Sequence, residues 1–404
     1  MRSSAGKRVL MLLENNPYPQ DGRVRREARA LADAGYQVTV ICPADSGQLR
    51  RERLSDVRVY RFPAPPAANG FLGYLWEYGY SMLAVFVLSL FALVREGFDV
   101  VHAHNPPDTF VFIAAFYKLW GKRFVFDHHD LAPEMYYARF RGNSRRPVYR
   151  TLVALEKLSC RLADHVIATN QSYKAVEMER GRVPEERITI VRNGPESDLL
   201  RPVEPEARLR QKGKTIIGYV GVMGVQDGAD CLLRALKHLV CDLGRTDFVG
   251  VFVGAGDALP DLKALTKRLG LVERVLFTGW VDHTQVARYL SAMDICAAPE
   301  PSNAYNDRST VIKIMEYMTM AKPIVAFDLP EHRFTAQAAA LYARPNDELD
   351  FARVLARLMD DPALRQATGA LGCQRVETEL AWRYSVPNLL KAYQTLWSGS
   401  GDER

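Results

Sequence analysis

The stretch of the chain with the most candidate functional side chains covers residues 300–323. An apolar run just before it, Ile295–Ala297, predicts a parallel strand, and the polar residues that follow predict a helix beginning near Ser309. The N-terminus of such a helix favours an anion, because unpaired N–H groups and the helix dipole converge there. Arg308 and Lys313 lie on either side of this helix start, and two cations so placed suit a diphosphate group.

Glu316 follows two turns into the same predicted helix. A carboxylate at this point has the reach to accept two hydrogen bonds from the diol of a ribose. The alternative is an ordinary capped surface helix whose charges are solvated. The residues alone leave both interpretations open.

Histidines follow two predicted strands in the first half of the chain. His128 and His129 come directly after Arg123–Phe126, at the carboxyl end where open α/β sheets place their ligands. His102 and His104 lie in a similar position at the end of another predicted strand. For His128 and His129, a pair of loop histidines bonded to the backbone is the alternative.

Several common motifs are missing from the sequence, and this narrows the chemistry. The first predicted strand leads into a segment with a single glycine, Gly22, so the dinucleotide fingerprint G-x-G-x-x-G is missing there. Gly254 and Gly256 form a G-x-G without the third glycine, and neither a P-loop nor a D-x-D pair occurs. A nicotinamide dehydrogenase is therefore disfavoured, and phosphate chemistry would proceed without a carboxylate-bound metal.

A regular frame has to position these residues, and short apolar runs alternate with helical patterns along nearly the whole chain. Residues 193–213 instead carry prolines and charges, which predicts an interdomain linker. We expect two consecutive doubly wound α/β domains and a helical tail from Asp350 that ends in Trp382–Trp397. The expected strands are Arg8–Leu13, Gln37–Ile41, Val57–Phe62, Val100–His102, Arg123–Phe126, His165–Ala168, Ile188–Val191, Thr215–Val220, Phe248–Val253, Val275–Thr278, Ile295–Ala297 and Ile324–Phe327.

The composition is that of a globular protein. A chain of 404 residues predicts two or three domains, and 48% hydrophobic with 25% charged residues argues against disorder. Six scattered cysteines without a C-x-x-C pair fit a reducing compartment. The N-terminal apolar run is too short for a signal peptide, so we expect a cytoplasmic protein.

The excess of positive over negative charge is confined to the first half. Residues 1–195 hold 28 Lys and Arg against 20 Asp and Glu, whereas the remainder holds 25 against 27. A basic surface predicts an anionic partner such as a membrane or a phospholipid. Nucleic acid is disfavoured, because no aromatic–basic RNA-binding pattern, zinc finger or basic heptad is present; a solvated surface is the alternative. Clustered arginines contribute to this charge: Arg139, Arg141, Arg145, Arg146 and Arg150.

The segment Tyr78–Val94 contains no charged residue and is 17 residues long, which is the lower limit for spanning a bilayer. Charged residues flank it closely, and a predicted strand follows at once. A spanning helix, a helix embedded in the membrane interface and an ordinary core helix all remain open.

Taken together, the motifs resemble family-4 glycosyltransferases of the GT-B fold, over essentially the whole second half and, in order and spacing, in the first half. The second half contributes IGYVGVMGVQDGADCLLRAL, FVGAGDALPDL, VLFTGWVDHTQVARYLSAMDICAAP and NDRSTVIKIMEYMTMAKPIVAFD. The first half contributes QDGRVRREARALADAGYQVTVIC, FDVVHAHNPPD, VFDHHDLAPEMY and IVRNG.

The resemblance implies an α/β protein with two Rossmann-like domains facing each other across a cleft. Residues 1–195 would form an N-terminal acceptor-binding domain, 196–213 a linker, and 214–380 a nucleotide-sugar-binding domain. Residues 381–404 would form a helix that crosses back to the N-terminal domain.

The resemblance also assigns donor-binding residues. The family carries an E-x7-E motif whose second glutamate contacts the donor ribose; by spacing this is Glu316, while the first falls on Arg308. An Arg and a Lys of the family fall on Val222 and Asp227, so this chain resembles a sub-branch with NDxST in place of the first glutamate. Other groups must then balance the negative charge of the diphosphate. The candidate donor-binding residues are Gly22, Gly254, Arg308, Ser309, Thr310, Lys313 and Glu316.

In the family, a histidine corresponding to His129 lies beside the transferred sugar, so His129 and Glu316 are the candidate catalytic residues. His104, Asp130 and Glu134 are candidates for the acceptor side.

The expected activity is that of a retaining, metal-independent glycosyltransferase without a cofactor. It would move a sugar from a nucleotide-diphosphate sugar to a glycan or lipid-linked saccharide in cell-surface polysaccharide or glycolipid biosynthesis. We expect it in the cytoplasm, peripherally bound to the inner face of the plasma membrane. The alternatives are a sugar-nucleotide epimerase on the same fold and a non-catalytic nucleotide-sugar-binding subunit of a synthase complex.

Overall fold

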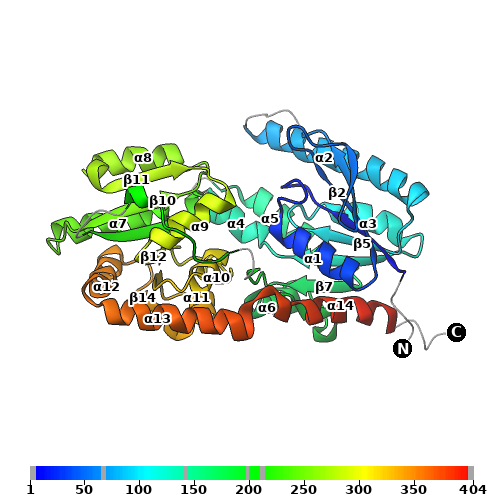
Figure 1. The fold of residues 1–404 in the computed structure, drawn as a ribbon. Helices are drawn as coiled ribbons and strands as arrows, with labels where there is room; N and C mark the ends of the chain where they lie inside the picture. Colours follow the sequence, from blue (N-terminus) through cyan, green and yellow to red (C-terminus); the bar gives the residue numbers. More distant parts are fainter. Residues whose placement is uncertain (1–5, 65–69, 141–143, 197–199, 210–213, 399–404) are drawn as a thin grey trace. The chain divides into compact units, whose positions relative to one another are not determined.

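A computed structural model describes residues 6–64, 70–140, 144–196, 200–209 and 214–398, which form two compact units (Figure 1). The first unit comprises Met1–Pro133, Ser144–Arg192 and Ser385–Arg404, and the second comprises Glu134–Asn143 and Asn193–Tyr384. This division differs from the expected one at three places, because residues 134–140, residues 193–195 and residues 381–384 belong to the second unit.

The described residues of the first unit form a sheet of eight strands in the order β3-β4-β2-β1-β5-β6-β7-β8. Neighbouring strands are parallel except for β3 and β4, which are antiparallel. The strands are β1 (Arg8–Leu12), β2 (Gln37–Pro43), β3 (Arg51–Leu54), β4 (Val57–Phe62), β5 (Val100–His104), β6 (Arg123–His128), β7 (His165–Ala168) and β8 (Ile188–Ile190).

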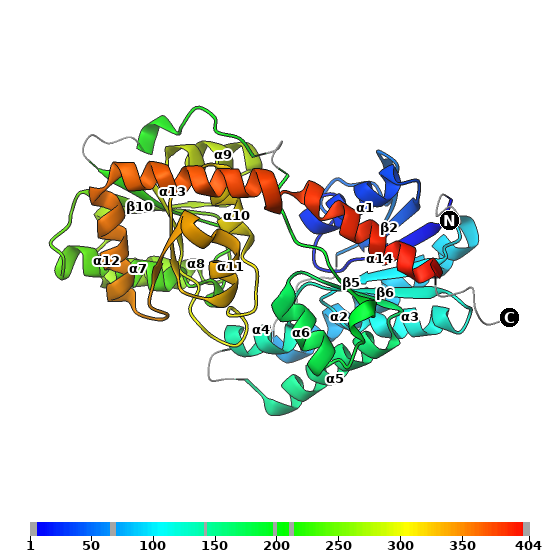
Figure 2. The ribbon, with the colours of Figure 1, turned by 90° about the horizontal axis from the view of Figure 1, so that it is seen from below.

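Helices cover both faces of this sheet, as buried parallel strands require. The crossover helices α2, α3, α5 and α6 lie on one face, and α1 and the C-terminal helix α14 lie on the other (Figure 2). The helices are α1 (Gly22–Asp33), α2 (Gly70–Arg95), α3 (Phe110–Lys118), α5 (Arg146–Leu162), α6 (Gln171–Glu179) and α14 (Val386–Ser398).

Helix α1 is well determined by its sequence. The side chain of Asp21 caps the helix by accepting a hydrogen bond from the amide of Val24 at 2.9 Å. Val24, Ala28 and Leu31 are buried at the expected four- and three-residue spacing. This orientation carries Arg23 and Glu27 inward as well, and both side chains are buried.

Helix α2 contains the apolar segment singled out in the sequence. The stretch Trp76–Arg95 is long and apolar enough to cross a membrane by length and composition, yet only 22% of its most apolar window is buried. An ordinary core helix is therefore the wrong interpretation of this segment, because a core helix buries most of its side chains. Among the clustered arginines that follow it in the chain, Arg145, Arg146 and Arg150 are exposed near the start of α5, and Arg141 lies outside the described residues.

The second unit has a parallel sheet that, within the described residues, runs β11-β10-β9-β12-β13-β14. Its strands are β9 (Thr215–Val220), β10 (Phe248–Val253), β11 (Val275–Gly279), β12 (Ile295–Ala298), β13 (Ile324–Phe327) and β14 (Ala340–Ala343). Its helices are α4 (Ala132–Arg139, which begins in the first unit), α7 (Ala229–Cys241), α8 (Leu259–Arg268), α9 (His283–Ala292), α10 (Ile312–Thr319), α11 (Pro330–Ala336), α12 (Glu348–Asp360) and α13 (Pro362–Arg375).

The strand order places a topological switch point in each sheet. In the second unit the chain runs outward from β9 to β10 and β11 and then returns to β12 on the other side of β9. In the first unit the corresponding point lies between β1 and β5. Open α/β sheets bind ligands outside the carboxyl ends of the strands at such points.

Four expectations about elements are wrong. The sequence analysis missed the edge strands β3 and β14, which are only four residues long, and β3 also lacks the apolar run that marks the central strands. Helix α10 begins at Ile312 rather than near Ser309, and the last helix begins at Val386 rather than Trp382. Part of the expected linker, residues 197–199 and 210–213, lies outside the described residues, and Leu209 packs into the core of the second unit.

Gly254, at the end of β10, offers a test of how tightly this frame is packed. Its φ is +129°, and a Cβ there would lie 2.1 Å from the carbonyl oxygen of Gly221. We expect Gly254→Ala to destabilise the second unit by roughly 2 kcal/mol or more, because the backbone is strained and has no room to shift. The measurement is the urea midpoint of unfolding.

Gly270→Ala is the matched control. Gly270 also has a positive φ, +70°, but nothing lies within 4 Å of a Cβ placed there. The loss in the free energy of unfolding should therefore be about 1 kcal/mol. Equal losses in the two variants would contradict the close approach of the two loops.

Candidate functional site

Two glycine-containing turns meet at the carboxyl edge of the second sheet. The turn after β9 and the turn after β10 are joined by backbone hydrogen bonds from Gly221 N to Val253 O and from Met223 N to Ala255 O, each 3.0 Å. Gly254 N donates to Gly279 O at 3.1 Å, which ties in the end of β11. Gly254 therefore holds the backbone that borders the switch point in place.

Lys313 lies at this switch point as one half of a buried ion pair. Its Nζ is 2.6 Å from Glu300 Oε1, at the end of β12, and 3.0 Å from the hydroxyl of Tyr219, at the end of β9. The ammonium also lies over the Tyr219 ring, 4.1 Å from its centre. Burial opposes its charge, but Glu300, Tyr219 and Asp227 together outweigh burial and hold the pKa of Lys313 well above its usual value.

This geometry corrects the sequence-based role of Lys313. The residue is 8% exposed, and its charge is balanced by Glu300 inside the protein. Its clearest function in the structure is therefore to join the ends of β9 and β12 and the first turn of α10, rather than to provide a free cation for a diphosphate.

The segment before α10 folds into a turn of its own, which explains the late start of the helix. The side-chain oxygen of Asn303 accepts hydrogen bonds from the amides of Tyr305 and Asn306, both at 2.9 Å. Ser309 donates through its amide and its hydroxyl to the carbonyl of Tyr305. The polar residues expected to cap α10 thus stabilise this turn instead, and the Ser309 amide is already bonded within it.

Other predicted donor-binding residues follow along the same edge. Arg308 donates to the carbonyl of Ala304 at 2.7 Å, and the Thr310 hydroxyl lies 3.2 Å from Glu331 Oε2. Glu316 lies in the second turn of α10 and is partly exposed. The structure therefore places Arg308, Thr310 and Glu316 near the start of one helix at the switch point of the sheet.

The two family cations that this chain lacks are replaced by very different groups. Val222 is exposed, and its carbonyl accepts a hydrogen bond from Tyr219 OH at 2.6 Å. Asp227 points back into its own turn and accepts from the amide of Gly224 at 2.8 Å. Burial raises the pKa of Asp227, although Lys313 opposes this shift.

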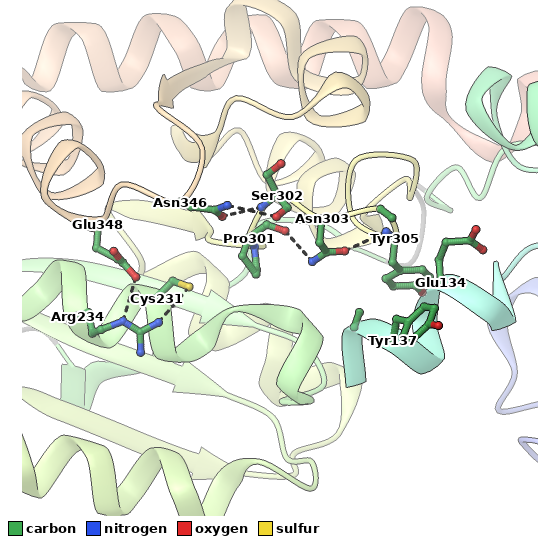
Figure 3. A pocket seen from close by; sticks show the side chains of 12 residues that line it. Glu134, Tyr137, Cys231, Arg234, Pro301, Ser302, Asn303, Tyr305, Asn346 and Glu348 are labelled. Carbon is green, nitrogen blue, oxygen red and sulfur yellow. Dashed lines mark hydrogen bonds and ion pairs between the residues drawn. The ribbon is translucent and has the colours of Figure 1, made fainter. Parts of the chain in front are cut away.

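A pocket of about 360 Å³ borders the same segment (Figure 3). Asn346 bonds the backbone of Ser302, and Arg234 bonds Glu348, along one side of it. Glu134 and Tyr137 of α4 line its other side (Figure 3). Glu134, expected on the acceptor side, is thus part of a pocket lined by residues of the second unit.

In the first unit, Asp127 is the centre of a buried polar cluster at the carboxyl end of β6. Arg23 binds both of its oxygens, from Nε at 2.7 Å and from Nη2 at 2.6 Å. His104 Nδ1 and His129 Nδ1 lie 2.7 Å and 3.3 Å from Asp127 Oδ2. Burial disfavours the charged carboxylate, but Arg23, His129 and His104 outweigh it and hold the pKa of Asp127 well below its usual range.

The ionised state of Asp127 fixes the orientation of His129. A carboxylate only accepts hydrogen bonds, so the Nδ1 atom of His129 carries the proton that faces it. Burial opposes protonation of His129, but the adjacent Asp127 raises the pKa of the imidazole above its usual value. Its side chain stays 17% exposed, so the ring combines a fixed orientation with access from outside.

The backbone around His129 is also held. Asn105, just after β5, accepts hydrogen bonds from the amides of His129 and Asp130 at 2.8 Å and 3.1 Å, and donates to the carbonyl of Asp130 at 2.7 Å. Asp130 itself is partly exposed beside His129. Gly22 is the first residue of α1, one residue before Arg23.

His104 is not available to an acceptor, which corrects its expected role. It is fully buried, stacked on His102 at 4.3 Å between ring centres, and bonded to Asp127. His102 in turn bonds the hydroxyl of Tyr393 at 2.7 Å, and burial lowers its pKa well below its usual value. Both residues position Asp127 from inside.

His128 belongs to a separate buried cluster. Its ring nitrogens lie 3.2 Å from Glu177 and 3.5 Å from Glu156. Burial opposes its charge, but these carboxylates raise the pKa of His128 well above its usual value. His128 is therefore a structural residue, whereas its neighbour His129 faces outward.

Four side chains of the first unit have the composition of a metal site. Ligand atoms of Glu27, His102, His104 and Asp127 lie within 4.8 Å of one another. Arg23 already lies against both carboxylates, however, 3.0 Å from Glu27 Oε1. A guanidinium in this position supplies the positive charge that a metal ion would bring.

Sequence reasoning missed Arg23, Asp127 and Glu300. Arg23 and Asp127 are 104 residues apart, and nothing in either local pattern links them. One feature of the sequence could have linked them: Arg23 lies at a predicted helix start and Asp127 follows a predicted parallel strand, at the same edge of the sheet.

Comparison with known proteins identifies the family. Residues 23–198 match the family described as Glycosyltransferase Family 4, and residues 214–361 match Glycosyl transferases group 1. The chain is therefore a glycosyltransferase of family 4.

Individual relatives extend this comparison. The chain is 23% identical over 356 residues to 2-deoxystreptamine glucosyltransferase of Streptomyces kanamyceticus, covering 84% of this chain and 89% of the relative. Sucrose-phosphate synthase from Thermosynechococcus elongatus has the same fold, with a TM-score of 0.78, 21% identity and coverage of 98% and 100% of the two chains. HepE of Anabaena, solved in complex with UDP-glucose, aligns with a TM-score of 0.70, 18% identity and coverage of 96% and 99%. These structures place the chain in the GT-B fold.

The structural role of Lys313 leads to a stability prediction. Lys313→Met would leave the Glu300 carboxylate buried without its cation, and we expect a loss of about 3–5 kcal/mol in the free energy of unfolding. Urea unfolding measures the loss, with Lys263→Met as the control, since Lys263 is exposed on α8.

The double variant Lys313→Met with Glu300→Gln should recover part of this loss, because both charges are gone. An unchanged stability of Lys313→Met would mean that the pair is not structural and would return Lys313 to the diphosphate-binding candidates.

Proposed function

We propose that this glycosyltransferase is a retaining, metal-independent enzyme that takes its sugar from a nucleotide-diphosphate sugar. The observation that carries the proposal is the convergence at the β9–β12 switch point of a glycine turn, the start of α10 and the partly exposed Glu316. This is where an open α/β sheet binds a ligand. The sugar nucleotide in the HepE complex is a precedent from a protein of the same fold.

Glu316 would bind the ribose of the donor. It occupies the position of the second glutamate of the family motif, and its helix starts at the carboxyl edge of the sheet. The diphosphate would lie at the N-terminal end of α10, where the helix dipole and Arg308 favour negative charge. In a metal-free mechanism these groups stabilise the departing nucleotide diphosphate, which is the main electrostatic contribution to the rate.

The turn that contains Val222 and Asp227, where the family carries an Arg and a Lys, is compatible with a diphosphate at the start of α10. Asp227, which replaces a family lysine, turns its carboxylate toward the Gly224 amide and lies near Lys313. Its negative charge is thereby partly compensated, which reduces its repulsion of a diphosphate.

His129 would act at the transferred sugar. Asp127 orients its ring and raises its pKa, so the outward Nε2 is a hydrogen-bond donor over a wider pH range than an isolated histidine offers. A hydrogen-bond donor beside the sugar stabilises the negative charge that develops on the departing diphosphate as its bond to the sugar breaks. Arg23 and His104 hold Asp127 and act through it as positioning residues.

The acceptor is proposed to be a glycan or a lipid-linked saccharide of cell-surface polysaccharide or glycolipid biosynthesis. Support comes from Asp130 beside His129 and from the pocket that Glu134 lines, since carboxylates suit sugar hydroxyls. The basic first half and the exposed apolar helix α2 favour an amphiphilic, anionic acceptor and a place on the inner face of the cytoplasmic membrane.

A non-catalytic, nucleotide-sugar-binding subunit is the second candidate, because Val222 and Asp227 replace two family cations. It differs from the enzyme in one observable: it would bind a nucleotide diphosphate but release no sugar from the donor at any protein concentration. A screen of UDP, GDP and ADP by thermal shift identifies the nucleotide for the experiments below.

Two substitutions should separate donor binding from turnover. Glu316→Ala removes a charged hydrogen-bond acceptor from the ribose. A hydrogen bond to a charged group contributes ~1.5–3 kcal/mol, so we expect nucleotide affinity to fall about tenfold or more. His129→Ala should leave affinity nearly unchanged and lower turnover by roughly 10²-fold or more. Calorimetry measures the first quantity and donor consumption the second.

Each variant is the control for the other, and circular dichroism checks that both fold. Unchanged nucleotide affinity in Glu316→Ala would contradict the ribose assignment. Equal losses of affinity and turnover in His129→Ala would reduce His129 to a structural residue, and isomerised donor without transfer would indicate an epimerase.

Metal independence has a direct test. With the diphosphate held by α10 and Arg308, we expect donor consumption to persist in excess EDTA, because no step needs a divalent ion. A loss of activity that Mg²⁺ or Mn²⁺ restores would overturn the metal-free mechanism.

A further inference from the structure

The outward face of α2 carries large apolar side chains, while its inward face carries small and polar ones. The side chains buried on the inward face are Ser81, Val85, Ser89 and Ala92. The exposed side chains repeat at the same four- and three-residue spacing: Leu83 (65% exposed), Val87 (55%), Phe91 (44%) and Val94 (86%). A surface helix in water has the opposite arrangement, with its large apolar residues inward.

Buried hydroxyl groups fix this orientation. The Ser89 hydroxyl lies 2.7 Å from the hydroxyl of Tyr117, and the Ser81 hydroxyl donates to Glu14 at 3.2 Å. Rotating α2 to bury its large apolar side chains would separate these groups from their partners, and unpaired buried polar groups are costly. The exposed apolar face is therefore a consequence of how the helix packs.

Helix α3 extends the apolar surface. Phe86 of α2 contacts Phe116 edge to face, with ring centres 5.2 Å apart, and Phe116 contacts Trp120 at 5.1 Å. Both helices lie on the same face of the sheet (Figure 2). We define the docking face as the exposed residues Trp76, Leu83, Val87, Phe91, Val94, Phe112, Leu119 and Trp120.

Arginines border the docking face at the C-terminal end of α2. The Arg95 guanidinium lies over the ring of Phe91, 4.8 Å from its centre. Arg51 and Arg58 both pair with Glu96, at 2.9 Å and 3.1 Å. Together with Arg95, these two guanidinium groups outnumber the one carboxylate and leave a positive charge beside the apolar surface.

We propose that the docking face binds an anionic lipid bilayer, with α2 lying in the plane of the membrane interface. This inference names the surface that the proposed membrane-linked acceptor would require and in that respect rests on the proposed function. Apolar side chains would enter the acyl boundary while the arginines meet lipid phosphates. Trp76 and Trp120 are of the residue type that membrane interfaces favour.

Two other occupants fit the observations less well. A spanning helix would have to leave the sheet and break the Ser81 and Ser89 contacts. A second copy of the chain would bring two sets of bordering arginines together, and like charges across an interface oppose association.

Co-sedimentation with vesicles tests the proposal without donor or acceptor, so it does not depend on the reaction. The probes are vesicles of phosphatidylcholine with phosphatidylglycerol, against phosphatidylcholine alone, across a salt series. We expect binding to the anionic vesicles that weakens as salt rises. Leu83→Glu with Val87→Glu should lower this binding by about tenfold or more, because charge replaces two inserted aliphatic side chains.

The matched control is Val272→Glu with Leu371→Glu, which changes two exposed aliphatic residues of the second unit in the same way. Its vesicle binding should equal that of the unaltered chain. A second comparison uses two double variants. Arg51→Gln with Arg95→Gln should reduce the salt dependence of vesicle binding. Arg208→Gln with Arg353→Gln should leave it unchanged, since Arg208 and Arg353 are exposed elsewhere.

Each remaining outcome overturns the proposal. Equal vesicle binding by Leu83→Glu with Val87→Glu and by its control would exclude the docking face. Salt-independent binding to neutral vesicles would indicate insertion of α2. A self-associating chain that becomes monomeric in this variant, measured by sedimentation velocity, would show that a second copy covers the face. Donor consumption with a water-soluble acceptor reports separately on the proposed function.

Discussion

The buried carboxylate of Asp127 is the charge on which the site of the first unit depends. It lies at the end of β6, and Arg23, which reaches it from α1 with two hydrogen bonds, is the largest contributor to its stability as an anion. Once ionised, it can orient His104 from within and His129 from the outer side. The cap at Asp21, the buried face of α1 and the register of β5 with β6 all serve to bring these groups together.

The second unit also contains a buried ion pair at the carboxyl edge of its sheet, but this pair has a different role. Lys313 and Glu300 form a buried pair at the β9–β12 switch point, with Tyr219 as a third partner. Arg23 holds the carboxylate that orients His129, whereas Lys313 joins strand ends and a helix start. A buried ion pair in such a place is weak support for stability, but it fixes the geometry of what surrounds it.

The central frame was predictable from the sequence, and its details were not. Parallel strands such as β9 and β10 are marked by apolar runs because they are covered on both faces. The edge strand β3 reads Arg-Glu-Arg-Leu and has no such mark. The start of α10 was wrong because Asn303 and Ser309 could cap either a helix or a local turn, and only the tertiary contacts decide between them.

The site was predictable to a similar degree. His129 and Glu316 were chosen because each follows a strand or helix start that the pattern predicts, and their roles stay predictions. The burial of Lys313 and His104 could not, because it depends on Glu300 and Asp127, whose partners lie on other elements. The orientation of α2 was equally hidden: when nearly every side chain is apolar, periodicity does not say which face packs on the sheet.

The return of α14 to the first unit has a consequence for biosynthesis. Tyr393, near the end of this helix, supplies the buried hydroxyl that His102 binds, and Ser385 and Asn388 bond the backbone near β8. A ribosome releases these residues after the whole second unit has been made. Domains usually fold in the order of their synthesis, but here the unit that is translated first is completed last, and a chain shortened by its final helix would leave His102 without that partner.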